Sequence, residues 1–298
     1  MASPELVATL IAGTGAKLSD AFLQELARQS KKAGLQSLRV AWLAPDKAAD
    51  IFGAGLGADA WRDLLNQALA LEPIDVIVQA AAKRCKKLLV ADMESTIIEQ
   101  ELLDELAGEI GLRDQVAAIT RRAMNGEIDF VAALRERMAL FKNRPVSLLE
   151  KAARGITYMP GAAALVAAMK KNGAKAWLVT GGFSFFAAPV AAKLGFDGYH
   201  ANELIIENGI LTGEARVPIL DRNRKKALLE QACAELSLSV ADSLCVGDGA
   251  NDVPMLTACV EGGGLGIAYH AKPKVREAIP HQINHADLTA LLYAQGLR

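Results

Sequence analysis

The sequence predicts an α/β fold with a doubly wound, mostly parallel sheet. Over residues 87–295, short apolar runs typical of buried strands alternate with helical patterns, an order that places helices on both faces of a parallel sheet. Polar residues follow three of these runs, at the strand ends where open α/β sheets bind their ligands. A helical insert interrupts this alternation of strands and helices. A separate α+β pattern precedes the whole α/β region.

The composition excludes several classes of protein. The 298 residues suffice for two domains, and 33 basic residues nearly balance 34 acidic ones, which gives no general attraction for nucleic acid. The four cysteines form no CxxC pair, as is typical of a reduced, cytoplasmic protein. The N-terminus has an apolar run but no basic lead, and no apolar run is long enough to cross a bilayer. We therefore expect a cytoplasmic protein with neither nucleic acid nor membrane as a partner.

Residues 1–82 are predicted to form a separate α+β domain. Their elements follow the order β-α-β-β-α-β of a ferredoxin-like fold, and this order resembles an ACT-type regulatory domain. A regulatory or dimerising role, and hence a homodimer, is one possibility. The glycine cluster at 13–17 lacks the ending of a phosphate-binding loop, and the one at 53–57 lacks a strand-to-helix context, so both are interpreted as turns. The expected strands are Leu6–Ile11, Ser37–Leu43, Ala48–Phe52 and Ile74–Gln79, and the helices are Ser19–Lys32 and Trp61–Leu71.

Residues 83–298 are predicted to form the larger domain. The insert, at about 97–157, is helical in pattern with a turn signal at Asn125-Gly126, and we expect it to lie over the strand ends as a lid. Further on, Asn208-Gly209 between apolar runs predicts a hairpin over 203–217. The expected strands are 88–91, 176–180, 244–246 and 265–268. One expected helix runs from Pro160 to Lys171, a second follows Gly181-Gly182 and ends at Leu194, and a third covers 224–236.

The polar residues at the strand ends suggest phosphoryl transfer. Carboxylates without His or Cys suit Mg²⁺, which reduces the repulsion between a carboxylate nucleophile and a phosphate. Asp92 is the candidate nucleophile, and Glu94 can pass a proton to the leaving oxygen and later take one from water. The groups that could hold the phosphoryl oxygens are Lys225, Thr180 and the Gly181 N–H, and the other polar residues at these ends are Asp248, Asn251 and Asp252.

These motifs together resemble the haloacid dehalogenase superfamily of phosphotransferases. That superfamily carries an Asp-x-Asp-x-Thr loop, a Ser or Thr on the second strand, a Lys, and a Gly-Asp-x-x-x-Asp loop. All four occur here in order, as Asp92–Thr96, Thr180–Gly182, Lys225 and Gly247–Asp252. The resemblance implies a haloacid dehalogenase-like fold with a helical cap. It also implies Mg²⁺ held by Asp92, Asp248 and the backbone carbonyl of Glu94, with Asp252 orienting these ligands.

Within the superfamily, the chain resembles the phosphoserine phosphatases. The matching stretches are ADMESTIIEQELLDELA, MNGEIDFVAALRERMAL, LVTGGFSFF, VGDGANDVPML and GLGIAYHAKPKV. The resemblance implies that Glu101 holds the substrate amine, that Arg137 holds its carboxylate, and that Phe130 supplies an apolar wall. Asn251 is assigned to substrate binding with them. The expected reaction is hydrolysis of O-phosphoserine through an aspartyl-phosphate, the last step of serine biosynthesis.

Two departures from the pattern and several alternatives stay open. Glu94 stands where the family has Asp, and Thr180 stands where these phosphatases usually have Ser. Arg135, rather than Arg137, could bind the carboxylate, and Asp252 could cap a helix over 253–258. His281 and His285 would share a helix face, but no further ligand accompanies them. The alternative functions are action on another small phosphomonoester or another phosphoryl acceptor, and a catalytically weak protein that senses an amino acid.

Overall fold

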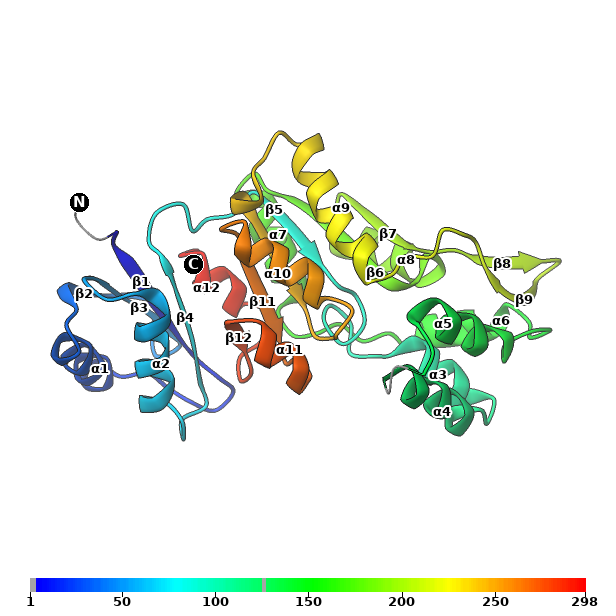
Figure 1. Ribbon diagram of the computed structural model, residues 1–298, viewed down its shortest axis with the longest axis horizontal. Coiled ribbons are helices and arrows are strands. Elements are labelled where there is room, and N and C mark those ends of the chain that lie inside the picture. Colours follow the sequence, from blue (N-terminus) through cyan, green and yellow to red (C-terminus); the bar gives the residue numbers. More distant parts are fainter. Residues whose placement is uncertain (1–3, 125–126) are drawn as a thin grey trace.

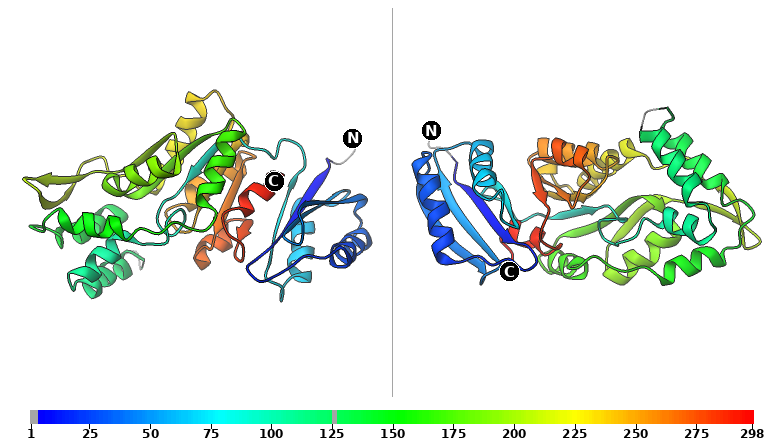
Figure 2. Two further views of the ribbon diagram at one scale, coloured as in Figure 1. Left: turned by 180° about the vertical axis from the view of Figure 1, so that it is seen from behind. Right: turned by 90° about the horizontal axis from the view of Figure 1, so that it is seen from below.

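The computed structural model describes residues 4–124 and 127–298, so the predicted turn at Asn125-Gly126 lies outside the described residues. The described chain has three parts in a row (Figure 1). A small antiparallel sheet lies at one end, a large parallel sheet lies in the middle, and helices with a two-stranded hairpin lie at the far end. Two further views show the same order (Figure 2).

The N-terminal part has the predicted ferredoxin-like element order. Its four strands pair in the order β2-β3-β1-β4, and every pair is antiparallel. The side chains of Leu10, Trp61 and Leu65 are buried between the sheet and its two helices. The elements are β1 (Leu6–Ala12), α1 (Asp20–Lys32), β2 (Gln36–Ala44), β3 (Ala48–Ala54), α2 (Ala58–Ala68) and β4 (Ile74–Ala80).

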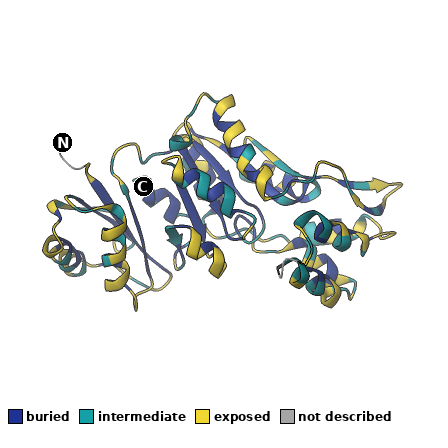
Figure 3. Cartoon of the chain, viewed as in Figure 1, coloured by how far each residue is buried: buried dark blue, intermediate teal, exposed yellow. Residues whose placement is uncertain are grey.

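The large sheet has six parallel strands in the order β12-β11-β10-β5-β6-β7. Its strands are buried between helices (Figure 3). Alternate residues of β5 face opposite cores: Leu89 packs with α7, α8 and α12, whereas Leu88 packs with α9, α10 and α11. The strands are β5 (Leu88–Ala91), β6 (Lys175–Phe183), β7 (Gly198–Asn202), β10 (Ser243–Gly247), β11 (Leu265–Tyr269) and β12 (His281–Ile283). The helices are α7 (Ala162–Lys171), α8 (Ser184–Leu194), α9 (Arg222–Glu235), α10 (Val253–Glu261), α11 (Pro273–Ala278) and α12 (Ala290–Ala294).

This arrangement confirms the predicted fold class and corrects some of its elements. The strand expected to end at Thr180 continues to Phe183, so Gly181 and Gly182 belong to β6. The two edge strands β7 and β12 were not predicted. His281 lies in β12, so it shares no helix face with His285.

The insert forms a helical cap, as expected. It contains α3 (Leu102–Glu109), α4 (Arg113–Met124), α5 (Phe130–Ala139) and α6 (Ser147–Arg154). The predicted hairpin is present as β8 (Leu204–Glu207) and β9 (Ile210–Ala215). Positive φ angles at Asn208 and Gly209 fit the tight turn that this pair favours. The hairpin packs on α5 and accepts the Val146 N–H at the Gly209 carbonyl, so the cap is tied to the core at a second place.

The N-terminal part meets the edge of the large sheet through β4 and β12. The buried Asp75 of β4 accepts hydrogen bonds from three consecutive backbone N–H groups, those of residues 284–286. The His281 Nε2 donates to the Val78 carbonyl at 3.3 Å. These contacts fix the position of the antiparallel sheet relative to the parallel one. Over the described ranges, no helix has the length and apolar character needed to span a membrane.

Candidate active site

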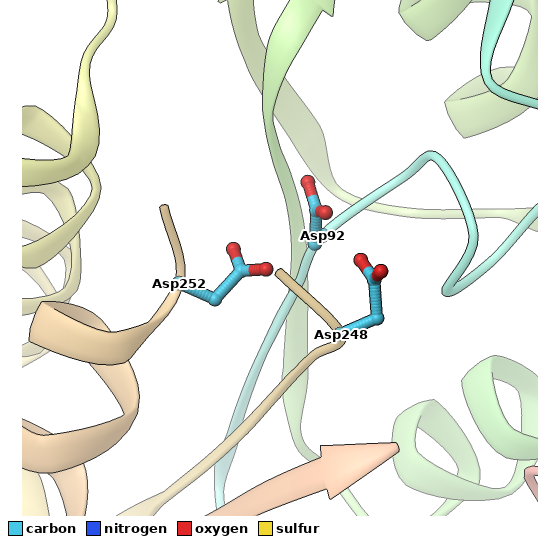
Figure 4. A group of neighbouring side chains, drawn as sticks. All are labelled: Asp92, Asp248 and Asp252. Atoms are coloured by element: carbon cyan, nitrogen blue, oxygen red, sulfur yellow. The ribbon is translucent and has the colours of Figure 1, made fainter. Parts of the chain in front are cut away.

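The candidate site lies where β5 and β10 end side by side. The chain runs from β5 to β6 on one side and later returns to β10 on the other, so the strand order reverses at this point. Asp92 follows β5, and its backbone N–H donates to the Val246 carbonyl of β10 at 3.0 Å. Oxygen atoms of Asp92, Asp248 and Asp252 lie within 4.8 Å of one another. Figure 4 shows these carboxylates gathered around one space.

Lys225 of α9 connects two of these carboxylates. Its Nζ lies 2.6 Å from Asp92 Oδ1 and 2.6 Å from Asp252 Oδ1, and its side chain is only 1% exposed. Burial lowers the pKa of Lys225, but Asp252 and Asp92 raise it more, so the ammonium stays charged. Burial and Asp252 raise the pKa of Asp92, against the opposing effect of Lys225. One buried ammonium therefore offsets only part of the charge of three carboxylates.

Asp252 is oriented into the site by glycines. Its Oδ2 accepts the Gly249 N–H at 3.0 Å. A Cβ at Gly247 would lie 2.5 Å from Asp252 Cγ, so only glycine permits this close approach. Asp252 occupies the N-cap position of α10, but its side chain makes no capping hydrogen bond. The predicted N-cap position is confirmed, but the carboxylate contacts Lys225 and Gly249 instead of capping the helix.

The residues present fit a divalent metal ion. The buried acidic cluster offers hard oxygen ligands, which Mg²⁺ prefers, and it carries more negative charge than Lys225 compensates. Burial also raises the pKa of Asp248 to about 6, against the opposing effect of the Lys272 ammonium.

Glu94 reaches from the Asp92 loop to the start of the cap. Its Oε1 accepts the backbone N–H of Leu102, the first residue of α3, at 2.9 Å. A Cβ at Gly182 would lie 2.7 Å from Glu94 Oε2, so this glycine leaves room for the longer side chain. Burial, and then the charge of Glu101, raise the pKa of Glu94 to about 7.

The other residues predicted to bind the phosphoryl group or the substrate lie at the same edge of the parallel sheet. Thr180 is buried, and its Oγ1 accepts the Gly182 N–H at 2.9 Å. The Gly181 carbonyl accepts a hydrogen bond from Asn202 Nδ2, which fixes this end of β6. Asn251 packs against Gly249, where a Cβ would lie 2.3 Å from Asn251 Oδ1.

Cap residues face these groups from the other side. Arg137 is half-buried and Arg135 is exposed, which favours Arg137 of the two candidates. Burial lowers the pKa of Arg137, while Asp104, Glu94 and Glu101 raise it. A Cβ at Gly181 would lie 3.4 Å from Phe130 Cζ, so the Phe130 ring of the cap lies close to the core strand β6.

Lys272 is a site residue that we did not predict from the sequence. Its Nζ lies 3.2 Å from Asp248 Oδ2 and 3.4 Å from Glu101 Oε1. It falls within the matching stretch GLGIAYHAKPKV, but a lysine before a short helix carries no chemical signal of its own.

Comparisons with known proteins identify relatives of this chain. A family model described as haloacid dehalogenase-like hydrolase matches residues 89–257. A probable phosphoserine phosphatase of Schizosaccharomyces pombe is 40% identical over 240 residues, which cover 79% of each chain. Three other relatives are longer, and the chain spans 63%, 56% and 61% of their lengths.

Two solved structures extend the comparison. A haloacid dehalogenase family hydrolase from Salmonella enterica serovar Typhi has a TM-score of 0.85 at 29% identity, over 97% of this chain and 98% of that one. A phosphoserine phosphatase solved as a phospho-aspartyl intermediate analogue has a TM-score of 0.64 at 36% identity, over 70% of this chain and 98% of that one.

The chain therefore belongs to the haloacid dehalogenase-like hydrolase family and is an enzyme of that class. The resemblance to phosphoserine phosphatases that the sequence motifs indicated is confirmed.

Proposed function

We propose that this enzyme hydrolyses O-phosphoserine to serine and phosphate through a phosphorylated Asp92. The observation that carries the proposal is the buried triad of Asp92, Lys225 and Asp252, with Nζ 2.6 Å from each carboxylate. Lys225 orients Asp92 and supplies positive charge at the point where an anionic phosphoryl group must approach. The phosphoserine phosphatase relatives support the choice of substrate.

In the first step, an Asp92 oxygen attacks the phosphorus while the bond from phosphorus to the serine oxygen breaks. Glu94 gives its proton to that departing oxygen, so serine leaves as a neutral alcohol. A carboxyl whose pKa is raised to about 7 can carry this proton near neutral pH. The Thr180 hydroxyl, the Gly181 N–H and Lys225 hold the phosphoryl oxygens, and Asn251 lies beside them.

In the second step, Glu94 takes a proton from water, and the water oxygen attacks phosphorus. The bond from phosphorus to the Asp92 oxygen breaks, which releases phosphate, restores the Asp92 carboxylate and leaves Glu94 protonated for the next cycle. Glu94 thus serves as acid and then as base, and its contact with Leu102 N–H holds it at the boundary between core and cap.

The proposed metal is Mg²⁺, held by Asp92, Asp248 and the backbone carbonyl of Glu94. When bound, it would offset the charge of the phosphoryl oxygens beside the attacking carboxylate. Asp252 orients the ligand set through Lys225 and Gly249.

The cap supplies the proposed selectivity for an amino acid. Arg137 can grip the substrate carboxylate with two parallel hydrogen bonds, and Glu101 can bind the ammonium group. Phe130 closes the side of the site next to Gly181. The charges of Glu101 and Arg137 influence each other, so a zwitterion could bind both groups at once.

Glu101→Gln tests the assignment of the substrate. We expect its KM for O-phosphoserine to rise about tenfold or more, because a charge-assisted hydrogen bond is lost. The KM for the analogue with hydroxyl in place of the amino group should stay within twofold of wild type. Initial rates of phosphate release with Mg²⁺ over a panel of phosphomonoesters measure both. A wild-type preference for esters without an amine would rule out O-phosphoserine as the substrate.

The wider setting of the reaction is also part of the proposal. With serine as product, the reaction would be the last step of serine biosynthesis, in the cytoplasm. The division between residues 82 and 83, a regulatory role for the N-terminal part and a homodimer stay predictions.

A further inference from the structure

Lys272 joins the core of the enzyme to its cap through two carboxylates. It lies between β11 and α11, and its backbone N–H donates to the Asp248 carbonyl at 3.0 Å. Its Nζ lies 3.2 Å from Asp248 Oδ2 and 3.4 Å from Glu101 Oε1. The backbone contact fixes the base of the side chain, and the ammonium group bridges the two acids.

The two lysines of the site differ in freedom. The Lys225 side chain is 1% exposed and is held between two buried aspartates, whereas the Lys272 side chain is 61% exposed. Asp248 is buried, but the Lys272 ammonium and the Glu101 carboxylate are exposed, so water can replace the lysine at modest cost, comparable to the ~1 kcal/mol that exposed ion pairs contribute. Lys272 therefore holds its carboxylates weakly and can release them.

Under the proposed function, both carboxylates have other partners during turnover. Asp248 is a proposed ligand of Mg²⁺, and Glu101 is the proposed partner of the substrate ammonium. Each of these ligands is a cation that would bind a carboxylate contacted by Lys272 in the structure. Lys272 would therefore compete with each incoming cation for a shared carboxylate.

We propose that Lys272 is an exchangeable cation that occupies Asp248 and Glu101 until Mg²⁺ and the substrate ammonium displace it. This inference rests on the proposed function for the identity of the incoming cations. In the free enzyme, Lys272 reduces the repulsion between the two acids and links the start of α3 to the β10 loop. Its displacement by ligands breaks that link, so binding of the cations and release of the cap are coupled.

The proposal is tested by titrating free protein with Mg²⁺ in a calorimeter. Without the competing ammonium, Lys272→Met and Lys272→Gln should bind Mg²⁺ about two- to fivefold more tightly than wild type, the range that an exposed ion pair allows. Lys272→Arg, which keeps the charge, should bind like wild type.

Lys274→Met is the matched control for the loss of one positive charge. Lys274 lies two residues further on, in α11, is exposed, and forms no ion pair among the residues that the structure describes. It should leave the affinity unchanged. Equal or weaker Mg²⁺ binding by both Lys272 variants, an equal gain in Lys274→Met, or no Mg²⁺ binding by wild type would each overturn the proposal.

The titration separates this inference from the proposed function. It needs no substrate and no turnover, so a failure to hydrolyse O-phosphoserine would leave the affinity difference as an independent result. Conversely, normal hydrolysis with unchanged affinity in both Lys272 variants would reject the role of Lys272 alone.

Discussion

Glu94 has a longer reach than the aspartate found at its position in the family pattern. The additional methylene places Oε1 on the Leu102 N–H at the start of the cap, while the glycine at 182 leaves space beside Oε2. A carboxylate at a helix N-terminus is also stabilised by the helix dipole. This departure from the family pattern is thus accommodated by contacts on both sides of the Glu94 carboxyl group.

Glu94→Gln is expected to lower kcat by about 10²- to 10⁴-fold, because the amide can neither give nor take the required proton. Glu94→Asp should keep kcat within about tenfold of the wild-type value. The carboxyl group is retained, but the shorter side chain makes a poorer hydrogen bond with the Leu102 N–H. Steady-state phosphate release measures both, and the two circular dichroism spectra should match that of wild type. Full activity of Glu94→Gln would refute the acid–base role.

The nucleophile and its partners could be placed from the sequence because parallel strands end at a common edge. Asp92 and Asp248 follow neighbouring strands, and the sheet brings them together. Lys272 could not be found in this way. Its position depends on how α11 packs beside the β10 loop, and a lysine before a proline is an ordinary surface pattern.

Individual elements were predictable where their apolar pattern was strong. β5 and β10 are short runs of buried residues between clear turn signals. β7 and β12 were missed because edge strands need few apolar residues: β7 reads Gly-Tyr-His-Ala-Asn, and β12 has three residues. The extension of β6 through Gly181-Gly182 was missed because paired glycines usually signal a turn.

The contact between β12 and β4 should make stability sensitive to acid through His281. Burial lowers the pKa of His281 from 6.5 to about 4, with Arg62 adding to the shift. Between pH 6.5 and pH 4, His281 is protonated in the unfolded chain but stays neutral in the folded protein. The free energy of unfolding therefore falls as the pH falls from 6.5 toward 4. The loss should be about 2 to 3 kcal/mol at pH 4.

Denaturant unfolding at pH 7 and pH 4 measures this effect. His281→Gln removes the titrating ring, so its loss of unfolding free energy over this range should be smaller than that of wild type by about the same 2 to 3 kcal/mol. His285→Gln, at an exposed position nearby, serves as the control and should follow wild type. An identical pH dependence in wild type and His281→Gln would contradict the assignment.

At the scale of the whole molecule, the site lies between the core and the cap, away from the N-terminal sheet. The N-terminal sheet contacts β12 and α12, at the opposite end from the cap helices (Figures 1 and 2). None of the site residues named above belongs to residues 4–82. The presence of an α+β part, a parallel sheet and a helical insert could be predicted from the pattern of strands and helices along the sequence. The packing of β4 on β12 could not, because it depends on side-chain contacts such as those of Asp75.

The most direct test of the central claim is phosphate release from O-phosphoserine with Mg²⁺ by wild type and Asp92→Asn. Wild type should release phosphate, and Asp92→Asn should lose at least about a thousandfold in kcat because the amide cannot form the phosphorylated intermediate. Lys225 keeps Asp252 as a buried partner in this variant, so the fold should persist. Turnover by folded Asp92→Asn at the wild-type rate would contradict the mechanism.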